Sequence, residues 1–255
     1  MSTNAQDTSA WRDLRPRLMS AAVLVAVAGT CIGLGGLAYD ALILGMMGGM
    51  AVEAATLFGL SIKSWRGVLY MLSLVFGAPL CAIMCVIILA GTALLWLRQA
   101  SFWPVLFVIA VVVASDSSAY VAGRIFGGPK LAPRISPGKT RSGAVGGLVG
   151  AVATGGIVAT LSGLGGMGSA LVWGGILGIS AQAGDLAESA MKRALGVKDS
   201  GKLLPGHGGL LDRFDGLVVA APVAALVSVC AGASMPFWAV GARTILRALA
   251  GHLPG

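Results

Sequence analysis

The sequence predicts an all-α polytopic membrane protein with about seven to eight transmembrane helices and polar loops on the cytoplasmic side. Its 255 residues are 56% hydrophobic and only 11% charged, whereas a soluble globular chain has roughly 25% charged residues. The mean hydropathy is +0.88. Most of the apolar residues fall in runs of roughly 20, the length that an α-helix needs to cross a bilayer.

The N-terminal part of the chain predicts a polar tail followed by two spans. Residues 1–18 form the expected cytoplasmic tail, and residues 19–255 form a single multi-span membrane domain. The first two spans are expected at 19–39 and 41–60, with Asp40 in the turn between them.

The remaining spans follow in order, separated by short polar breaks. The apolar stretch 67–97 is longer than one straight span needs, and we interpret it as one tilted or broken helix. Further spans are expected at 102–122, at 143–161, from 169 onward and at 217–233. We expect the helix that starts at 169 to continue through the polar segment after it. The tail 235–250 predicts an interfacial helix or a short eighth span.

The basic residues predict the orientation of the chain. With the N-terminus in the cytoplasm, fifteen of the 18 Lys and Arg residues fall in cytoplasmic segments, as the positive-inside rule requires. These segments are 1–18, 61–66, 123–142 and 184–216. The rule accounts for the net charge of +8, so no nucleic-acid partner is expected. The compact chain indicates a bacterial inner membrane.

The polar segment 184–216 concentrates charge between apolar runs. Asp185, Glu188 and Lys192 share one helix face. Ordinary ion pairs of a solvated loop would explain Glu188 with Lys192, but not acids at both membrane boundaries. Carboxylates beside Lys and Arg suit a magnesium ion that is itself bound to phosphates. The segment holds five of the ten acidic residues, namely Asp185, Glu188, Asp199, Asp212 and Asp215, and it also contains His207.

A second polar region begins at Asp116, near the end of an apolar helix. Its prolines prevent one continuous helix. The sequence Ser-Pro-Gly-Lys-Thr at 136–140 would present a backbone turn, a hydroxyl and an ammonium to a phosphate. Alternatively, the cations of this region bind anionic lipid headgroups. The glycine pattern of a Walker A loop is missing. The candidate residues here are Asp116, Tyr120, Arg124, Ser136, Lys139 and Thr140.

Glu53 is an acid deep in the second expected span. An ionisable residue inside a membrane segment is a candidate functional residue. Two interpretations stay open for it: a functional role, or a hydrogen bond within the helix bundle.

The motifs in 114–216 resemble those of the phosphatidate cytidylyltransferase (CDP-diacylglycerol synthase) family. Ser189-Ala190-Met191-Lys192-Arg193 and Lys198-Asp199 are followed by Pro205-Gly206-His207-Gly208-Gly209 and Asp212-Arg213-Phe214-Asp215. This pattern is similar to the family signature S-x-x-K-R-x4-K-D, a spacer, and P-x-H-G-G-x-x-D-R-x-D. The chain departs from the family at Ser117-Ser118, where Thr-Gly is common, and at Ser142, where Glu is common.

The resemblance implies an enzyme that converts CTP and phosphatidate into CDP-diacylglycerol and pyrophosphate, with its catalytic loops in the cytoplasm. It implies Asp185 and Asp212 as ligands of Mg²⁺, with a second cation such as K⁺ possible nearby, and Asp215 and Asp116 as their supports. The other catalytic residues it implies are Lys192, Arg193 and His207. The residues expected to bind the substrate phosphates are Ser136, Lys139, Thr140, Arg124, Lys198, Lys202, Asp116 and Tyr120.

The residues agree with this chemistry on separate grounds. A phosphate monoester loses its second proton near pH ~6, so it attacks as an anion and needs no general base. The remaining difficulty is the negative charge of both substrates, which Mg²⁺ and cationic side chains neutralise. Two alternatives stay open: a CTP-dependent polyprenol or phytol kinase, and an ion or solute transporter that uses Glu53, Asp116 and Asp185. The glycine-rich helices also allow a homodimer.

Overall fold

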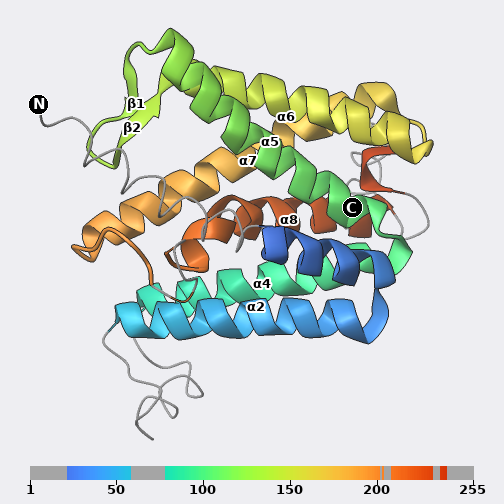
Figure 1. The fold of residues 1–255 in the computed structure, drawn as a ribbon, viewed down its shortest axis with the longest axis horizontal. Helices are drawn as coiled ribbons and strands as arrows, with labels where there is room; N and C mark the ends of the chain where they lie inside the picture. Colours follow the sequence, from blue (N-terminus) through green and yellow to red (C-terminus); the bar gives the residue numbers. More distant parts are fainter. Residues whose placement is uncertain (1–21, 59–77, 202, 204–207, 232–235, 240–255) are drawn as a thin grey trace, which may run out of the picture. The chain divides into compact units, whose positions relative to one another are not determined.

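The computed structural model describes residues 22–58, 78–201, 203, 208–231 and 236–239 (Figure 1). Two compact units share the chain. Unit 1 comprises Met1–Cys81 and Lys198–Arg213, and unit 2 comprises Ala82–Val197 and Phe214–Gly255. The expected tail 1–18, the loop 61–66, and residues Lys202 and His207 lie outside the described residues.

In unit 1, a helix over Ala22–Leu34 is followed at once by α2, which covers Gly36–Leu57. The two expected N-terminal spans are therefore helical where the structure describes them. The prediction that Asp40 lies in the turn is wrong, because Asp40 lies inside α2. The turn falls instead at Gly35 and Gly36, whose φ angles of 68° and 54° suit glycine, which has no Cβ.

Helix α4 covers Ala78–Ala100, with Ala82 onward in unit 2, and α5, also in unit 2, covers Trp103–Phe126. The described part of the long apolar stretch is thus one continuous helix, and residues 67–77 lie outside the description. The expected span 102–122 also extends four residues further, to Phe126, and Gly127 with a φ of 57° ends it.

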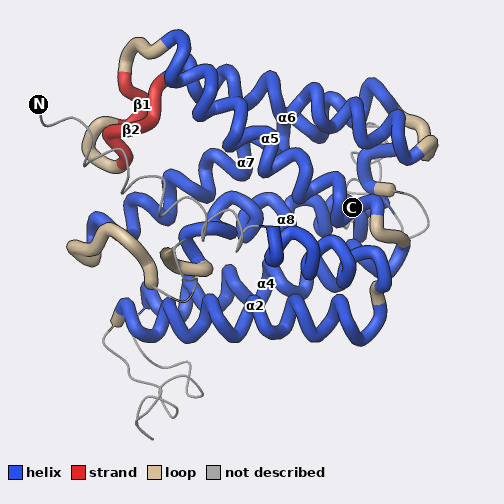
Figure 2. Tube along the Cα trace, in the orientation of Figure 1, coloured by secondary structure: helices blue, strands red, loops and turns tan. Residues whose placement is uncertain are grey.

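A β-hairpin joins α5 to α6, and Figure 2 shows its two strands in red. Strand β1 covers Lys130–Ala132 and pairs antiparallel with β2, which covers Ser136–Thr140. The prediction of a turn at 136–140 is wrong, because this stretch is the second strand and the turn falls at 133–135. In a two-stranded sheet every strand is an edge strand, so Pro137 is tolerated there.

Helix α6 covers Arg141–Ser162, and it packs against α5 and α7 through glycines. A Cβ added at Gly147 would lie 2.9 Å from the carbonyl oxygen of Ser115 on α5. A Cβ added at Gly155 would lie 2.6 Å from the carbonyl oxygen of Ala170 on α7. The glycine-rich sequence therefore allows close contact between helix backbones, as its small residues predict.

Helix α7 covers Met167–Ala194, and α8 covers Leu211–Ala231. The prediction that the helix from 169 continues through the polar segment is wrong beyond Ala194, because the helix ends there and Gly196 follows with a φ of 69°. Helix α8 begins before 217, so Asp212 and Asp215 lie in its first two turns.

Five of the described helices are long and apolar enough to cross a membrane: Gly36–Leu57, Leu80–Ala100, Trp103–Phe126, Arg141–Ser162 and Leu211–Cys230. The predicted class of all-α, multi-pass membrane protein is confirmed, with the hairpin as a small addition. The count of seven to eight spans stays a prediction. Of the tail 235–250, the structure describes only residues 236–239, where Phe237 and Trp238 are buried and Trp238 stacks on Phe107.

Candidate functional site

A cavity of about 640 Å³ opens between the hairpin and helices α5, α6 and α7 of unit 2. We call it the carboxylate cavity, because Asp116 and Asp185 are among its lining residues. Five of the eight residues that we expected to bind phosphates line it, together with Asp185. These five are Asp116, Tyr120, Arg124, Lys139 and Thr140.

The two predicted polar regions meet in this cavity through an ion pair. The ammonium of Lys139, in β2, contacts the carboxylate of Asp185, in α7. Their side chains are 26% and 31% exposed, so both remain accessible to water and ligands. The ion pair shows that the cavity holds a cation beside Asp185.

Thr140 has a structural role at this site. Its hydroxyl accepts a hydrogen bond from the backbone N–H of Gly143 at 3.1 Å, which caps the N-terminus of α6. Gly123 and Gly143 leave room for this hydroxyl, since a Cβ at either would lie within 3.0 Å of it. The cap fixes the end of β2 and therefore the position of its neighbour Lys139.

Tyr120 and Arg124 lie one turn apart on α5. The Arg124 guanidinium donates a hydrogen bond of 2.7 Å to the Tyr120 hydroxyl. A guanidinium has five N–H donors, and one of them makes this bond. The bond orients Arg124 at the cavity while leaving it able to bind a phosphate.

A third carboxylate, that of Asp215, acts on the same cluster. Asp116, Asp185 and Asp215 lie within electrostatic reach of one another and of Lys139. Glycine brings α8 to this position, because a Cβ at Gly184 would lie 2.5 Å from the carbonyl oxygen of Asp215. The three carboxylates outnumber the two cationic side chains at the cavity, Lys139 and Arg124, and the remaining negative charge favours a further cation.

Further along α7, Glu188 and Lys192 form the predicted ion pair at 3.2 Å. Arg193 donates from Nε to the carbonyl oxygen of Ile135 at 3.3 Å, so it links α7 to the hairpin. Ser136, next to Ile135, is half-buried in β2 and is not among the lining residues of the carboxylate cavity. The structure therefore joins Arg193 to the hairpin through a backbone contact.

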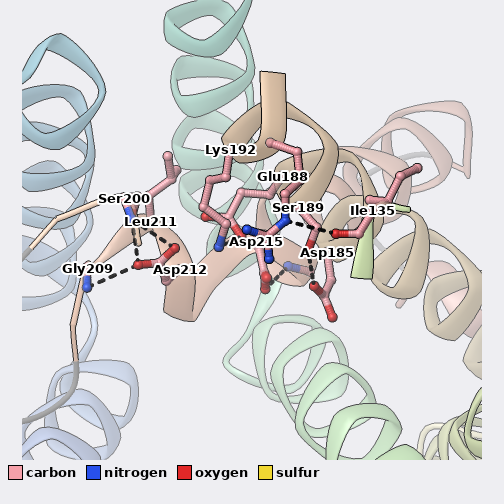
Figure 3. A network of polar contacts seen from close by, with 12 residues as sticks. Ile135, Asp185, Glu188, Ser189, Lys192, Ser200, Gly209, Leu211, Asp212 and Asp215 are labelled. Carbon is pink, nitrogen blue, oxygen red and sulfur yellow. Dashed lines mark hydrogen bonds and ion pairs between the residues drawn. The ribbon is translucent and has the colours of Figure 1, made fainter. Parts of the chain in front are cut away.

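Asp212 belongs to unit 1, and backbone amides hold its carboxylate. The N–H of Ser200 donates to it at 2.9 Å, and the N–H of Gly209 donates at 3.2 Å (Figure 3). The Ser200 side chain is 2% exposed, and its hydroxyl makes no hydrogen bond to any described residue. Lys198 and Asp199 are exposed beside it.

The residues present fit a magnesium ion. Asp185 already contacts a cationic group, the ammonium of Lys139. The buried Ser200 hydroxyl lies beside Asp212. No three His, Cys, Asp or Glu side chains in the described ranges converge to form a metal site by themselves. Mg²⁺ is usually bound through one or two carboxylates together with water and substrate phosphates. The absence of a three-residue cluster among the described residues therefore agrees with this mode of Mg²⁺ binding. Joint ligation by Asp185 and Asp212 stays a prediction.

The structure shows the contacts of two further polar residues, Gln182 and Glu53. Gln182 lines the carboxylate cavity and donates to the carbonyl oxygen of Ala144 at 3.1 Å. Its signal in the sequence is a polar residue in an apolar run, one turn before Asp185. Glu53 accepts hydrogen bonds from backbone N–H groups of unit 1, which decides between its two interpretations in favour of a hydrogen-bonding role.

Apolar helices of membrane-spanning length define this chain as a multi-pass membrane protein, and its cavity is lined by both acidic and basic side chains. Comparison with known proteins then identifies its family. The model of the cytidylyltransferase family matches residues 74–231, so the chain belongs to that family.

Three similar proteins are named phosphatidate cytidylyltransferase. The one from Brucella abortus is 57% identical over 120 residues, which are 47% of this chain and 44% of that protein. The one from Haemophilus influenzae is 47% identical over 122 residues, 46% of this chain and 42% of that protein. The one from Rickettsia felis is 38% identical over 138 residues, 50% of this chain and 59% of that protein. The matches thus cover about half the length of these relatives.

Proposed function

We propose that the protein transfers the cytidylyl group of CTP to phosphatidate, giving CDP-diacylglycerol and pyrophosphate for phospholipid synthesis. The observation that carries this proposal is the contact of Lys139 with Asp185 inside the carboxylate cavity. It joins a phosphate-binding cation to a metal-binding acid, and these come from the two sequence regions that resemble the family. Relatives that share about half of the chain carry the matching name.

In this reaction a phosphate oxygen of phosphatidate forms a bond to the α-phosphorus of CTP. The bond between the α-phosphorus and its bridging oxygen to the β-phosphorus breaks, and pyrophosphate leaves with the electron pair. The nucleophile is already an anion at neutral pH, which agrees with a site built from charges and without a Ser–His–Asp arrangement. Positioning and charge neutralisation therefore supply the catalysis.

The side chains divide this work. Asp185 and Asp212 would hold Mg²⁺, which supplies charge stabilisation for the phosphates and the leaving pyrophosphate. Lys139 and Arg124 bind phosphate oxygens at the cavity, and Arg193 contributes positive charge beside the hairpin. Asp116 and Asp215 keep the site negative enough to retain cations. Lys192, Lys198, Lys202 and His207 complete the proposed set, together with Tyr120, Ser136 and Thr140.

The proposed partners follow from the substrates. CTP is water-soluble, whereas phosphatidate has its phosphate at the membrane surface and its acyl chains in the bilayer. We place the site at the cytoplasmic face of a bacterial inner membrane, because the positive-inside rule puts both polar regions there. A second cation such as K⁺ and a homodimer complete the proposal.

The transporter alternative uses Glu53, Asp116 and Asp185 as relay groups, and it predicts movement of substrate in sealed vesicles without consumption of CTP. The kinase alternative differs in its products, which are a phosphorylated alcohol and CDP.

The test is pyrophosphate release by purified protein in detergent, with CTP, Mg²⁺ and phosphatidate each omitted in turn. The proposal predicts release only when all three are present. Release of CDP in place of pyrophosphate, with a lipid alcohol as acceptor, would support the kinase. Absence of any release from folded protein with all components present would contradict the proposed activity.

A further inference from the structure

Glu53 is a carboxylate inside an apolar helix, and its side chain is only 3% exposed. Its Oε1 accepts a hydrogen bond from the N–H of Leu203 at 3.2 Å, and its Oε2 accepts one from the N–H of Leu211 at 2.9 Å. We call this pair of bonds the Glu53 contact. A buried carboxylate is costly unless hydrogen bonds compensate for its lost hydration, so the two amides explain how the acid is tolerated.

The surface of α2 around Glu53 is shaped for the same chain segment. Gly49 lies one turn earlier, and a Cβ there would come within 2.7 Å of the Leu210 side chain and 3.0 Å of the Leu203 side chain. A Cβ at Gly201 would come within 2.5 Å of Oε1 of Glu53. Two glycines and one acid therefore fit α2 to residues on both sides of the start of α8.

The Glu53 contact reaches the predicted metal ligand through the backbone. Leu211 is the first residue of α8, where backbone N–H groups lack partners within the helix, and Asp212 is the second. Asp212 in turn accepts the N–H groups of Ser200 and Gly209. Glu53 and Asp212 thus hold alternate amides of one short stretch, which sets the direction of the Asp212 carboxylate.

We propose that Glu53 is a positioning residue, which fixes the N-terminus of α8 and thereby orients Asp212 toward its cation. This inference rests on the proposed function, because the value of orienting Asp212 lies in binding the metal of that reaction. Removing the groups that orient a metal ligand typically lowers metal affinity about 10- to 100-fold. We therefore expect the loss of Glu53 to raise the Mg²⁺ concentration that the enzyme requires more than it lowers the stability of the fold.

Three variants of full-length protein in detergent test the role of Glu53. Glu53→Ala removes both acceptors, and Glu53→Gln keeps the shape but only one acceptor oxygen. Asp40→Asn is the matched control, because Asp40 is an exposed acid on the same helix. We expect the Mg²⁺ concentration for half-maximal pyrophosphate release to rise roughly tenfold or more in Glu53→Ala, less in Glu53→Gln, and not in Asp40→Asn.

Hydrogen exchange provides a measurement that does not depend on activity. The amides of Leu203 and Leu211 should both exchange faster in Glu53→Ala than in wild type, and one of the two should do so in Glu53→Gln. Amides of α5 and α6 should keep their protection. Unchanged exchange at Leu203 and Leu211 would overturn the contact itself. Faster exchange with an unchanged Mg²⁺ requirement would overturn the positioning role.

A pair of size variants covers the case in which Glu53→Ala does not fold. Gly49→Ala should displace Leu210, whose side chain would lie 2.7 Å from the new Cβ, and raise the Mg²⁺ requirement. Gly49→Ala with Leu210→Ala should restore it. Failure of the double variant to recover, in folded protein, would contradict the inference. Absence of pyrophosphate release from wild type would overturn the proposed function instead, and hydrogen exchange would still decide whether the Glu53 contact exists.

Discussion

The two predicted metal ligands are held in different ways. The carboxylate of Asp185 is partly exposed and contacts the ammonium of Lys139, and lysine is a residue type whose side chain has a flexible stem. The carboxylate of Asp212 accepts backbone N–H groups of Ser200 and Gly209, which are fixed by the chain path. Asp185 can therefore exchange one cation for another, whereas Asp212 has a set direction. Asp185 is thus a predicted ligand that can change partners, and Asp212 is one that is preoriented.

The largest expected effect comes from the preoriented acid. Asp212→Asn removes a charge and places an amide NH₂ group where backbone donors now meet a carboxylate. We expect pyrophosphate release to fall by at least ~10³-fold, with no loss of the folded state. Full activity in this variant would contradict the metal role of Asp212, and Asp40→Asn serves as the control that should behave as wild type.

The next-largest effect is expected from the loss of Lys139, the cation that contacts the partly exposed Asp185. Lys139→Gln removes the cation that contacts Asp185, and we expect kcat/KM for CTP to fall by about 100-fold. Lys130→Gln is the matched control, because Lys130 is an exposed lysine of the same hairpin. Equal effects of the two substitutions would show that only the overall positive charge of the hairpin matters.

A smaller effect is expected from the helix contact that brings Asp215 to the cluster. In Gly184→Ala the new methyl group would lie 2.5 Å from the carbonyl oxygen of Asp215, so α7 and α8 must separate. We expect a loss of about 1–3 kcal/mol in stability and a reduction in activity on the order of tenfold. Thermal unfolding and pyrophosphate release would measure these.

The control for this prediction lies on the same helix. A Cβ at Gly168 of α7 meets nothing within 4 Å, so Gly168→Ala should leave both stability and activity close to wild type. Alanine has a higher helix propensity than glycine, so propensity cannot cause a loss in either variant. Equal losses in the two glycine variants would contradict the α7–α8 contact as the cause.

The smallest effect is expected at the rim of the carboxylate cavity. Tyr120→Phe removes only the hydroxyl that orients Arg124. The Tyr120 side chain is 65% exposed, so we expect a loss of about two- to threefold in kcat/KM, at the low end of the ~0.5–1.5 kcal/mol of a typical hydrogen bond. Arg124→Gln should lower kcat/KM more than Tyr120→Phe, and the reverse order would contradict the assigned roles.

The sequence predicts helices well because apolar runs of membrane length are a strong signal. It predicts the members of the carboxylate cavity for a different reason: Asp116, Arg124, Lys139 and Asp185 stand in motif positions that resemble the family. The hairpin was missed because β1 and β2 are short and contain or adjoin prolines. The turn at Gly35 was missed because the boundary between the first two spans was placed at Asp40, the charged residue between the two apolar runs.

Contacts that span the chain are hidden from pattern analysis. The N–H of Leu211 is 158 positions from its acceptor Glu53, and nothing in local spacing connects the two. Gly184 and Gly216 stand beside the acids Asp185 and Asp215 in the sequence, yet only the structure shows that they allow α7 and α8 to approach. A glycine next to an acidic residue in an apolar helix is therefore a sequence signal for a close approach between two helices.

In the proposed reaction the α-phosphorus of CTP is the atom attacked, and isotopic labels on the phosphates of CTP show whether this is so. Purified protein would be given phosphatidate, Mg²⁺ and CTP labelled either at the α- or at the γ-phosphate. We expect the α-label to enter the lipid product and the γ-label to leave as pyrophosphate. Transfer of the γ-label to lipid, with the α-label retained in CDP, would contradict the proposed reaction.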